Sequence, residues 1–332
     1  MKGGQVSVQS ECAVCSEYFT ESGKPHFEVI IPLYHSEKHI QKVFAYINQI
    51  SKAIPGGLAA TFVADGRLED YVEVSDQINS FQLPYKVILL SRNFGVGPAL
   101  HAALADSDYC ASAAFGSDLQ EPEELFIEFF TILAAGKADL VLGYRTKRAD
   151  PILSKYLAKF YWWVNKTFIH QNSPASGFDV FAMNRDVRKS FIKLCELNTN
   201  FTSQLLWVGF NPKWIGFERK SREIGKSTWS YRRKLKLFAD SLYGYSSKPI
   251  TLITVLGFLS SFAFFLIGIL TLVGKFTKQI VVPGYVMTIV LIAFGQSLLL
   301  FSMGIIGGYA SRGFENSTGR PNYIVARKFT SE

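Results

Sequence analysis

The segment FGSDLQEP, residues 115–122, contains an acid, Asp118, and an amide, Gln120, that could bind a phosphate group through a metal ion. The segment follows an apolar run that begins at Cys110, and a helical pattern with acidic residues in its first turn begins near Pro122. Strand, short loop and helix would thus place Asp118 at the carboxyl end of a strand, where open α/β sheets bind ligands. With a divalent cation, Asp118 could hold a diphosphate. An ordinary acidic helix start is the alternative explanation.

Similar polar loops follow the other strands that the sequence predicts. The strands are expected at residues 27–33, 59–63, 86–90, 109–115 and 138–144, with helical patterns between them. Strands that alternate with helices predict an α/β fold with a doubly wound, mostly parallel sheet. The carboxyl ends of parallel strands share one edge of the sheet, so we expect the polar residues that follow them to converge on a ligand site. These residues are Tyr34, His35, Asp65, Gly66, Arg92, Asn93, Asp118, Gln120 and Arg145.

Composition divides the chain into five parts. Residues 1–25 are polar, without the apolar core of a signal peptide, and predict a mobile N-terminal tail. Residues 26–230 carry the α/β pattern, and residues 231–248 form a basic amphipathic helix that lies either on a membrane surface or against the α/β domain. Residues 249–311 contain two uncharged apolar stretches, each longer than the roughly 20 residues that cross a bilayer. They predict transmembrane helices at about 250–274 and 282–308, with buried soluble helices as the alternative, and a C-terminal tail at 312–332.

The charge distribution indicates a membrane protein with a cytoplasmic catalytic domain. Hydrophobic residues make up 48% of the chain and charged residues only 19%, while the net charge is +8. Lys and Arg cluster before the first apolar stretch and after the second, which places the domain and both termini on the cytoplasmic side of the cell membrane. The positive charge favours anionic lipid and phosphate as partners, and no nucleic-acid-binding motif is present. Cys12 and Cys15 lack the second pair that a zinc site would need.

Seven motifs, taken in order, resemble those of family-2 glycosyltransferases of the GT-A fold. More narrowly, they are similar to polyprenyl-phosphate glycosyltransferases, such as bactoprenol-phosphate glucosyltransferases and dolichol-phosphate mannosyltransferases. The motifs are VIIPLY at 29–34, VADG at 63–66, LSRNFG at 90–95, SDLQEP at 117–122, GFD at 177–179 with Arg185, REIGKSTW at 222–229, and GIIGGY at 304–309 with Arg320-Pro321. The resemblance covers residues 27 to 328 and includes the two apolar stretches.

The resemblance implies an inverting hexosyltransferase. Such an enzyme moves a hexose from a nucleotide-diphosphate sugar to an undecaprenyl-type polyprenyl phosphate in the membrane, for the assembly or modification of a cell-surface glycan. It also implies a homo-oligomer packed through the membrane helices. A phosphate monoester is largely dianionic at pH 7, because its second pKa is about 6, so the acceptor needs little deprotonation. The harder task is to stabilise the leaving diphosphate, which calls for a metal ion and fixed cations.

The resemblance also implies a role for each site residue. Asp118 and Asp179 are the expected catalytic acids, and Asp179 lies near the acceptor phosphate as a base or a positioning group. Asp118 and Gln120 are expected to hold a divalent cation, Mg²⁺ or Mn²⁺, with the diphosphate. The donor nucleotide is expected to contact Pro32, Tyr34, Asp65, Arg92, Asn93 and Gln120. The phosphate groups, including that of the acceptor, are expected to contact Arg145, Arg148, Arg222, Lys226 and Ser227.

Four positions depart from the family pattern. Gly116 and Ala64 stand where the family usually carries acids, Phe181 replaces an arginine, and Gly308 replaces an acid of the second apolar stretch. Fewer carboxylates near the donor weaken metal binding and predict a weaker dependence on metal. Asp179 in a salt bridge to a nearby arginine is the alternative to its catalytic role.

Three other functions fit parts of the sequence. A processive polysaccharide synthase would carry Gln-x-x-Arg-Trp, whereas this chain has Gln-Leu-Leu-Trp at 204–207, without the arginine. The lost acids favour a catalytically degenerate membrane scaffold, which the retained Asp65, Asp118 and Gln120 oppose. A glycosyltransferase with a different lipid acceptor also remains open.

Overall fold

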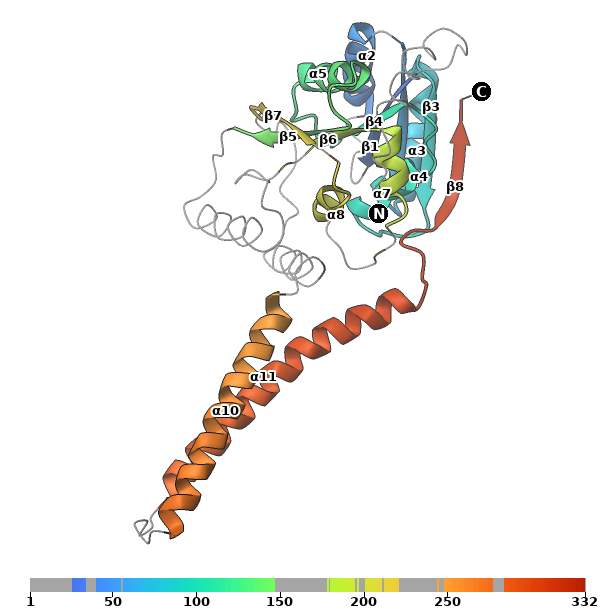
Figure 1. Cartoon of the computed structure of the whole chain (residues 1–332). Helices are drawn as coiled ribbons and strands as arrows, with labels where there is room; N and C mark the ends of the chain where they lie inside the picture. The colour runs from blue at the N-terminus through green and yellow to red at the C-terminus, as the bar shows by residue number, and fades with distance from the viewer. Residues whose placement is uncertain are drawn as a thin grey trace, which may run out of the picture.

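A mixed sheet with helices on both faces forms the body of the protein, and two long helices extend from it (Figure 1). This computed structural model describes residues 26–33, 40–54, 56–146, 178, 180–194, 196, 201–210, 212–220, 244, 248–276 and 284–331. The strands are β1 (Phe27–Leu33), β2 (Leu58–Ala64), β3 (Tyr85–Leu90), β4 (Ala111–Ala114), β5 (Leu140–Arg145), β6 (Val180–Asn184), β7 (Pro212–Phe217) and β8 (Val325–Thr330). The helices are α2 (Ile40–Ala53), α3 (Leu68–Gln77), the 3₁₀ turn η3 (Ile78–Ser80), α4 (Val96–Ala105), α5 (Glu123–Ala134), α7 (Arg185–Phe191), α8 (Phe201–Trp207), α10 (Lys248–Phe276) and α11 (Tyr285–Ser317).

The eight strands lie in the order β7-β5-β6-β4-β1-β2-β3-β8. The pairs β1–β2, β1–β4, β2–β3 and β5–β7 are parallel, and the pairs β3–β8, β4–β6 and β5–β6 are antiparallel. Six strands therefore run in one direction, and only β6 and β8 run against them. The predicted α/β fold with a mostly parallel sheet is confirmed, with antiparallel pairing at these two strands.

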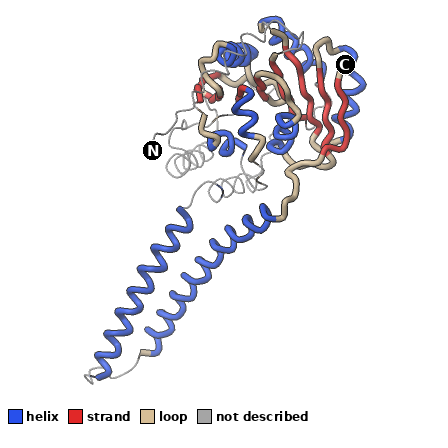
Figure 2. Tube along the Cα trace, turned by 45° about the vertical axis from the view of Figure 1, so that its right-hand side comes forward, coloured by secondary structure: helices blue, strands red, loops and turns tan. Residues whose placement is uncertain are grey.

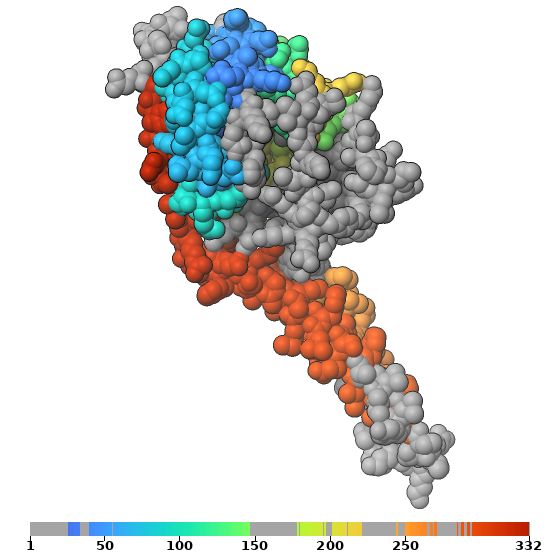
Figure 3. Space-filling model, turned by 180° about the vertical axis from the view of Figure 1, so that it is seen from behind, coloured from blue at the N-terminus to red at the C-terminus, as the bar shows by residue number. Residues whose placement is uncertain are grey.

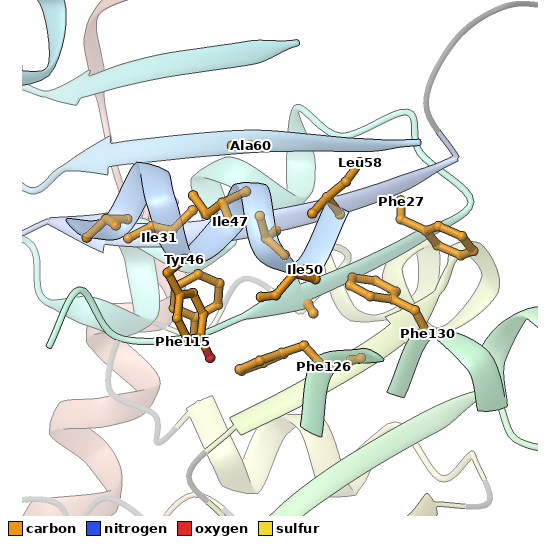
Figure 4. Packing of buried hydrophobic residues seen from close by; sticks show 14 of the residues in the cluster. Phe27, Ile31, Tyr46, Ile47, Ile50, Leu58, Ala60, Phe115, Phe126 and Phe130 are labelled. Atoms are coloured by element: carbon orange, nitrogen blue, oxygen red, sulfur yellow. The ribbon is translucent and has the colours of Figure 1, made fainter. Parts of the chain in front are cut away.

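Burial on both faces explains why β1 is an almost continuous apolar run. Val29, Ile31 and Leu33 pack into the core cluster that contains α2, α3 and α5, while Ile30 packs into the cluster that contains α4, α7 and α8. Helix α2 covers its face with a buried stripe that includes Ile47 and Ile50 (Figure 4). The result is a three-layer arrangement with β1 at its centre.

The chain reverses its direction of travel across the sheet beside β1. It runs outward from β1 to β2 and β3, and then returns to β4 on the other side of β1. Open α/β sheets bind ligands outside the carboxyl ends of the strands at such a switch point. The segment 115–122, which follows β4, therefore lies at the position that the topology favours for a ligand.

The end of the chain forms an edge strand that the sequence analysis did not predict. Residues 325–330, which it assigned to the C-terminal tail, pair with β3 as the antiparallel strand β8. Lys328 forms an ion pair with Asp106, which also pairs with Lys86 at 3.2 Å. Phe329 packs against the rings of Tyr71 and Tyr85. In the space-filling view, this red segment lies along the edge of the domain beside blue and cyan atoms (Figure 3).

Helices α10 and α11 run side by side away from the sheet (Figure 2). They include the two stretches for which the sequence predicts transmembrane helices, although α11 continues to Ser317. Large apolar side chains on both helices are exposed, among them Phe258 (72%), Leu270 (70%) and Met303 (67%). Nevertheless, none of the helices in the described part of the chain combines the length and apolar character needed to cross a membrane. The helical hairpin is thus present, but its transmembrane character is not confirmed.

Helix α8 was not predicted either, because its seven residues are too few for a clear periodicity. Two other segments fall outside the described residues: the tail at 1–25 and, apart from residues 244 and 248, the amphipathic helix expected at 231–248. The five-part division of the chain therefore stays a prediction.

A buried polar network joins the amino-terminal ends of β1, β2 and β4. Glu28 is fully buried and accepts hydrogen bonds from the hydroxyls of Thr61 at 2.6 Å and Ser112 at 2.9 Å. Ser112 in turn accepts a hydrogen bond from the buried guanidinium of Arg188 at 3.2 Å. Burial raises the pKa of Glu28 above its ordinary value of 4.5, although the hydrogen bonds from Ser107, Thr61 and Ser112 act in the opposite direction.

We expect Glu28→Gln to remove a loss of stability that the wild-type protein suffers as the pH rises. Because the pKa of Glu28 is higher in the folded state, the folded state binds the proton more tightly than the unfolded chain. The free energy of unfolding then falls as the pH rises from about 4.5 through the raised pKa. Urea titrations at several pH values would measure this fall, which should be shallower in the variant.

Glu128→Gln provides the matched control, because Glu128 lies exposed on α5. Its pH dependence should follow that of the wild-type protein. Parallel curves for wild type and Glu28→Gln would show that Glu28 does not contribute to this dependence.

Candidate active site

The turn after β4 holds Asp118 in a strained backbone. The N–H of Leu119 donates a hydrogen bond to the carbonyl of Gly116 at 3.2 Å, which closes the turn. Leu119 itself has φ +50°, in the left-handed region that residues with a side chain rarely adopt. Strain of this kind persists only where the surroundings enforce it, and it concentrates at functional sites.

The segment after β7 holds this turn in place. The N–H of Lys220 donates to the carbonyl of Gln120 at 2.8 Å, and the side-chain amide of Gln120 donates to the carbonyl of Lys220 at 3.2 Å. Gln120 is buried, with 6% of its surface exposed. Its amide therefore positions the two segments against each other, although they are 100 residues apart in the chain.

Arg219 adds two ion pairs to this contact. Its Nη2 lies 3.6 Å from Oδ2 of Asp118, and its Nε lies 3.5 Å from Oε1 of the buried Glu121. The Nε atom is itself buried, and no hydrogen-bond acceptor reaches it from the described residues. The guanidinium is thus held by charge, while donor capacity remains for a further anion.

Helix α2 supports the turn from the opposite side. The hydroxyl of Tyr46 donates a hydrogen bond to the carbonyl of Glu121 at 3.0 Å, and its ring packs edge-on against Phe115 (Figure 4). Burial raises the pKa of Tyr46, and the negative charges of Glu121, Glu123 and Glu124 raise it further. Tyr46 therefore stays a protonated donor at every physiological pH.

Asp65 clamps the loop that follows β3. One carboxylate oxygen accepts the N–H of Phe94 and the other accepts the N–H of Gly95, both at 2.8 Å. Next to it, Gly66 has φ +73°, and a Cβ at this position would lie 2.0 Å from the carbonyl carbon of Arg92. Glycine is therefore required where the loops after β2 and β3 touch. The carboxylate that was predicted to contact the nucleotide serves, in this structure, to hold the loop.

The other described site residues lie along the same edge. Pro32 pairs with Val63 near the carboxyl end of β1. Arg92 and Asn93 are exposed, and the guanidinium of Arg92 stacks on the ring of Phe94 at 4.3 Å. Arg145 is the last residue of β5 and pairs with Phe217, which lies two residues before Arg219 in the chain.

The remaining predicted site residues fall outside the described part of the chain. They are Tyr34, Arg148, Asp179, Arg222, Lys226 and Ser227. Phe178 and Val180, the neighbours of Asp179, are described, and Val180 pairs with Gly143 of β5. The roles that the resemblance implies for these residues stay predictions.

The described residues do not fit the cation site predicted at Asp118 and Gln120. A divalent cation needs several oxygen ligands, usually with more than one carboxylate. Asp118 faces a guanidinium, and Gln120, whose Nε2 donates to the carbonyl of Lys220, could offer only its amide oxygen. A Cβ at Gly116 would lie 2.9 Å from Oδ1 of Asp118, so the missing acid is the one that would stand beside Asp118. Across the described residues, no group of three or more His, Cys, Asp or Glu side chains could hold a metal ion.

Arg219, Glu121 and Tyr46 were missed as site residues. Arg222, Lys226 and Ser227 were chosen from the segment that follows Arg219, and Arg219 itself was not. The position of Arg219, two residues beyond the apolar strand β7, was a usable signal, because residues just after parallel strands share the ligand edge. Glu121 shares the segment 115–122 with Asp118, which was the available signal for it, whereas nothing in the sequence linked Tyr46 to Asp118.

We expect Asp65→Asn to destabilise the protein by about 2 kcal/mol, because one charge-assisted hydrogen bond is lost and an amide N–H₂ faces a backbone N–H. Urea titration of the full chain measures the effect. Asp76→Asn, at an exposed position of α3, is the matched control and should change little. Unchanged stability in Asp65→Asn would contradict the stabilising role of the hydrogen bonds from Phe94 and Gly95 to Asp65.

Comparison with known proteins finds glycosyltransferases. No family model matches the chain. The chain is 26% identical to an uncharacterized glycosyltransferase, YkcC, of Bacillus subtilis over 307 residues, which is 92% of this chain and 95% of that protein. It is 26% identical to a bactoprenol glucosyl transferase of Shigella phage SfV over 299 residues, 90% of this chain and 97% of that one. Among solved structures, the chain is similar to a mannosyltransferase from Pyrobaculum calidifontis in complex with GDP-Man and Mn²⁺. The TM-score is 0.48 and the sequence identity 12%, and the match covers 70% of this chain and 68% of that chain. The resemblance seen in the sequence is confirmed: the homologues of this chain are glycosyltransferases, bactoprenol glucosyl transferases among them.

Proposed function

We propose that the protein is an inverting glycosyltransferase that moves a hexose from a nucleotide-diphosphate sugar to a polyprenyl phosphate. The observation that carries the proposal is the cross-linked pair of segments at the switch point of the sheet. There, an acidic turn and a basic segment meet beside the central strand. The homologous bactoprenol glucosyl transferases, matched over nearly their whole length, support a lipid phosphate as acceptor.

The chemistry needs charge stabilisation more than a strong base. An oxygen of the acceptor phosphate attacks the anomeric carbon, the bond from that carbon to the diphosphate breaks, and the electron pair leaves with the nucleoside diphosphate. The acceptor is already dianionic at pH 7, so no proton has to be removed from the nucleophile. Fixed cations near the leaving group lower the barrier. Asp179 orients the acceptor phosphate in this proposal.

The helical hairpin supports the choice of a lipid acceptor. Exposed apolar side chains cover α10 and α11, and the stretches Ile250–Gly274 and Ile280–Ser311 carry no charge. In the proposal the hairpin attaches the protein to the cell membrane as a homo-oligomer, with the catalytic domain on the cytoplasmic side. A nucleotide sugar from the cytoplasm and a phosphate at the membrane surface would then reach the same edge of the sheet.

A catalytically degenerate scaffold is the second candidate. Gly116 and Ala64 stand where the family usually has acids. Asp118, an acid that this chain retains, forms an ion pair with Arg219. A scaffold would keep the fold and lack turnover with every donor.

A transfer assay distinguishes the two. Membranes that contain the full chain are incubated with labelled UDP-, GDP- and dTDP-hexoses and undecaprenyl phosphate. We expect one donor to label a lipid that releases the sugar in mild acid, and Asp179→Asn to lower the rate by about 10²-fold or more.

Glu128→Gln, exposed on α5, serves as the matched control and should transfer sugar at the wild-type rate. Absence of labelled lipid with every donor would favour the scaffold. Equal rates for wild type and Asp179→Asn would show that Asp179 does not contribute to the reaction.

A further inference from the structure

We infer that the guanidinium of Arg219, rather than a divalent cation, neutralises the donor diphosphate in this protein. The inference deepens the proposed glycosyl transfer and rests on it. It makes Arg219 a diphosphate-binding residue and predicts that nucleoside diphosphates bind without metal.

The position of Arg219 is the first argument. The residue follows β7, yet its guanidinium reaches the turn after β4, which lies beside the carboxyl end of β1. This is the switch point at which a parallel sheet receives an anionic ligand. The backbone pairing of Lys220 with Gln120 fixes the segment there, so the cation does not depend on a flexible side chain alone.

The charge at Asp118 is the second argument. A metal ion would need this carboxylate, but Arg219 already lies 3.6 Å from it. A divalent cation brought to the same carboxylate would meet the positive guanidinium and would find no acid at Gly116 to offset the repulsion. The loss of the acid and the presence of the arginine therefore both lower the affinity of the site for a divalent cation.

The hydrogen-bonding state of Arg219 is the third argument. Its two ion pairs, at 3.6 Å and 3.5 Å, are longer than charge-assisted hydrogen bonds, and no described residue accepts a hydrogen bond from its buried Nε. The buried Nε faces Glu121 at 3.5 Å, so a diphosphate would bind the accessible part of the guanidinium instead. The planar fork of a guanidinium matches two phosphate oxygens, which a diphosphate supplies.

Acidic and basic side chains meet around the guanidinium of Arg219. Arg145 at the end of β5 and Lys220 beside Arg219 are basic, whereas Asp118, Glu121 and Glu218 are acidic. Asp118 and Glu121 hold Arg219 in the absence of ligand. A diphosphate would compete with Asp118 for the exposed side of the guanidinium, because 24% of the Arg219 side chain is accessible.

Calorimetric titration of UDP, GDP and dTDP into the full chain tests the inference, once with EDTA and once with Mn²⁺. We expect the preferred nucleoside diphosphate to bind with the same Kd under both conditions. Binding only with Mn²⁺ would overturn the inference and leave the proposed function standing. Binding under neither condition would overturn both.

Two single substitutions have opposite expected effects. Arg219→Gln should weaken binding in EDTA by about ten- to a hundredfold, since hydrogen bonds to a charged group are lost, and Arg219→Lys should restore part of it. Asp118→Asn should tighten binding in EDTA about two- to fivefold, because the competing carboxylate is gone. A metal site predicts the reverse order of affinities in Mn²⁺: Asp118→Asn would lose binding, and Arg219→Gln would keep it. Because one variant is expected to gain affinity, unfolding cannot imitate the result.

A third substitution should create the missing cation site. Gly116→Asp places a second carboxylate beside Asp118, and the close contact of 2.9 Å is with the end of a side chain that can rotate. We expect nucleoside-diphosphate binding to become weaker in EDTA and to recover with Mn²⁺, whereas the neutral control Gly116→Asn should show no response to Mn²⁺. Equal behaviour of the two variants would contradict the idea that the lost acid explains independence from metal.

Discussion

Strand β1 is buried on both faces and pairs in parallel with β2 on one side and with β4 on the other. This pairing is what brings the loops after β2 and β4 to the two sides of one strand end. The loops after β3, β5 and β7 open on the same edge, because those strands share the direction of β1. The antiparallel strand β6 begins at this edge with Val180, so the chain reaches the site from that strand as well.

The contact between the turn at 116–121 and the segment at 219–220 joins distant parts of the domain by hydrogen bonds and charge. It also brings the guanidinium of Arg219 to Asp118, beside which Gly116 stands where the family usually has a second acid. A guanidinium at this place and the absence of that acid both make the local potential more positive, which favours a bound anion.

The C-terminal strand links the helical hairpin to the part of the sheet that carries the candidate active site. Past α11 the chain reaches Tyr323, whose ring lies near that of His101, and the carbonyl of Ile324 accepts the N–H of Ser91 at 2.9 Å. Ser91 opens the loop that Asp65 clamps at Phe94 and Gly95. The segment that leaves the hairpin is thus in direct contact with a loop of the candidate active site.

The sequence alone was enough to predict the alternation of strands and helices, and with it the edge at which the polar loops converge. Local signals were sufficient, because periodicity, turn residues and helix starts depend on neighbours along the chain. It also pointed to Asp118, to the missing acid at Gly116 and to the two apolar helices. Strand β8 escaped prediction, since an exposed edge strand such as VARKFT has no clear apolar pattern.

The contacts of the site residues, by contrast, follow from the three-dimensional arrangement of the strands. Asp65 proved to hold a loop, Gln120 to bind a backbone carbonyl, and Arg219 to face Asp118. Each of these contacts joins residues between 29 and 101 positions apart in the chain. Such partners meet because of strand order and direction, which long-range packing sets and which no local pattern encodes.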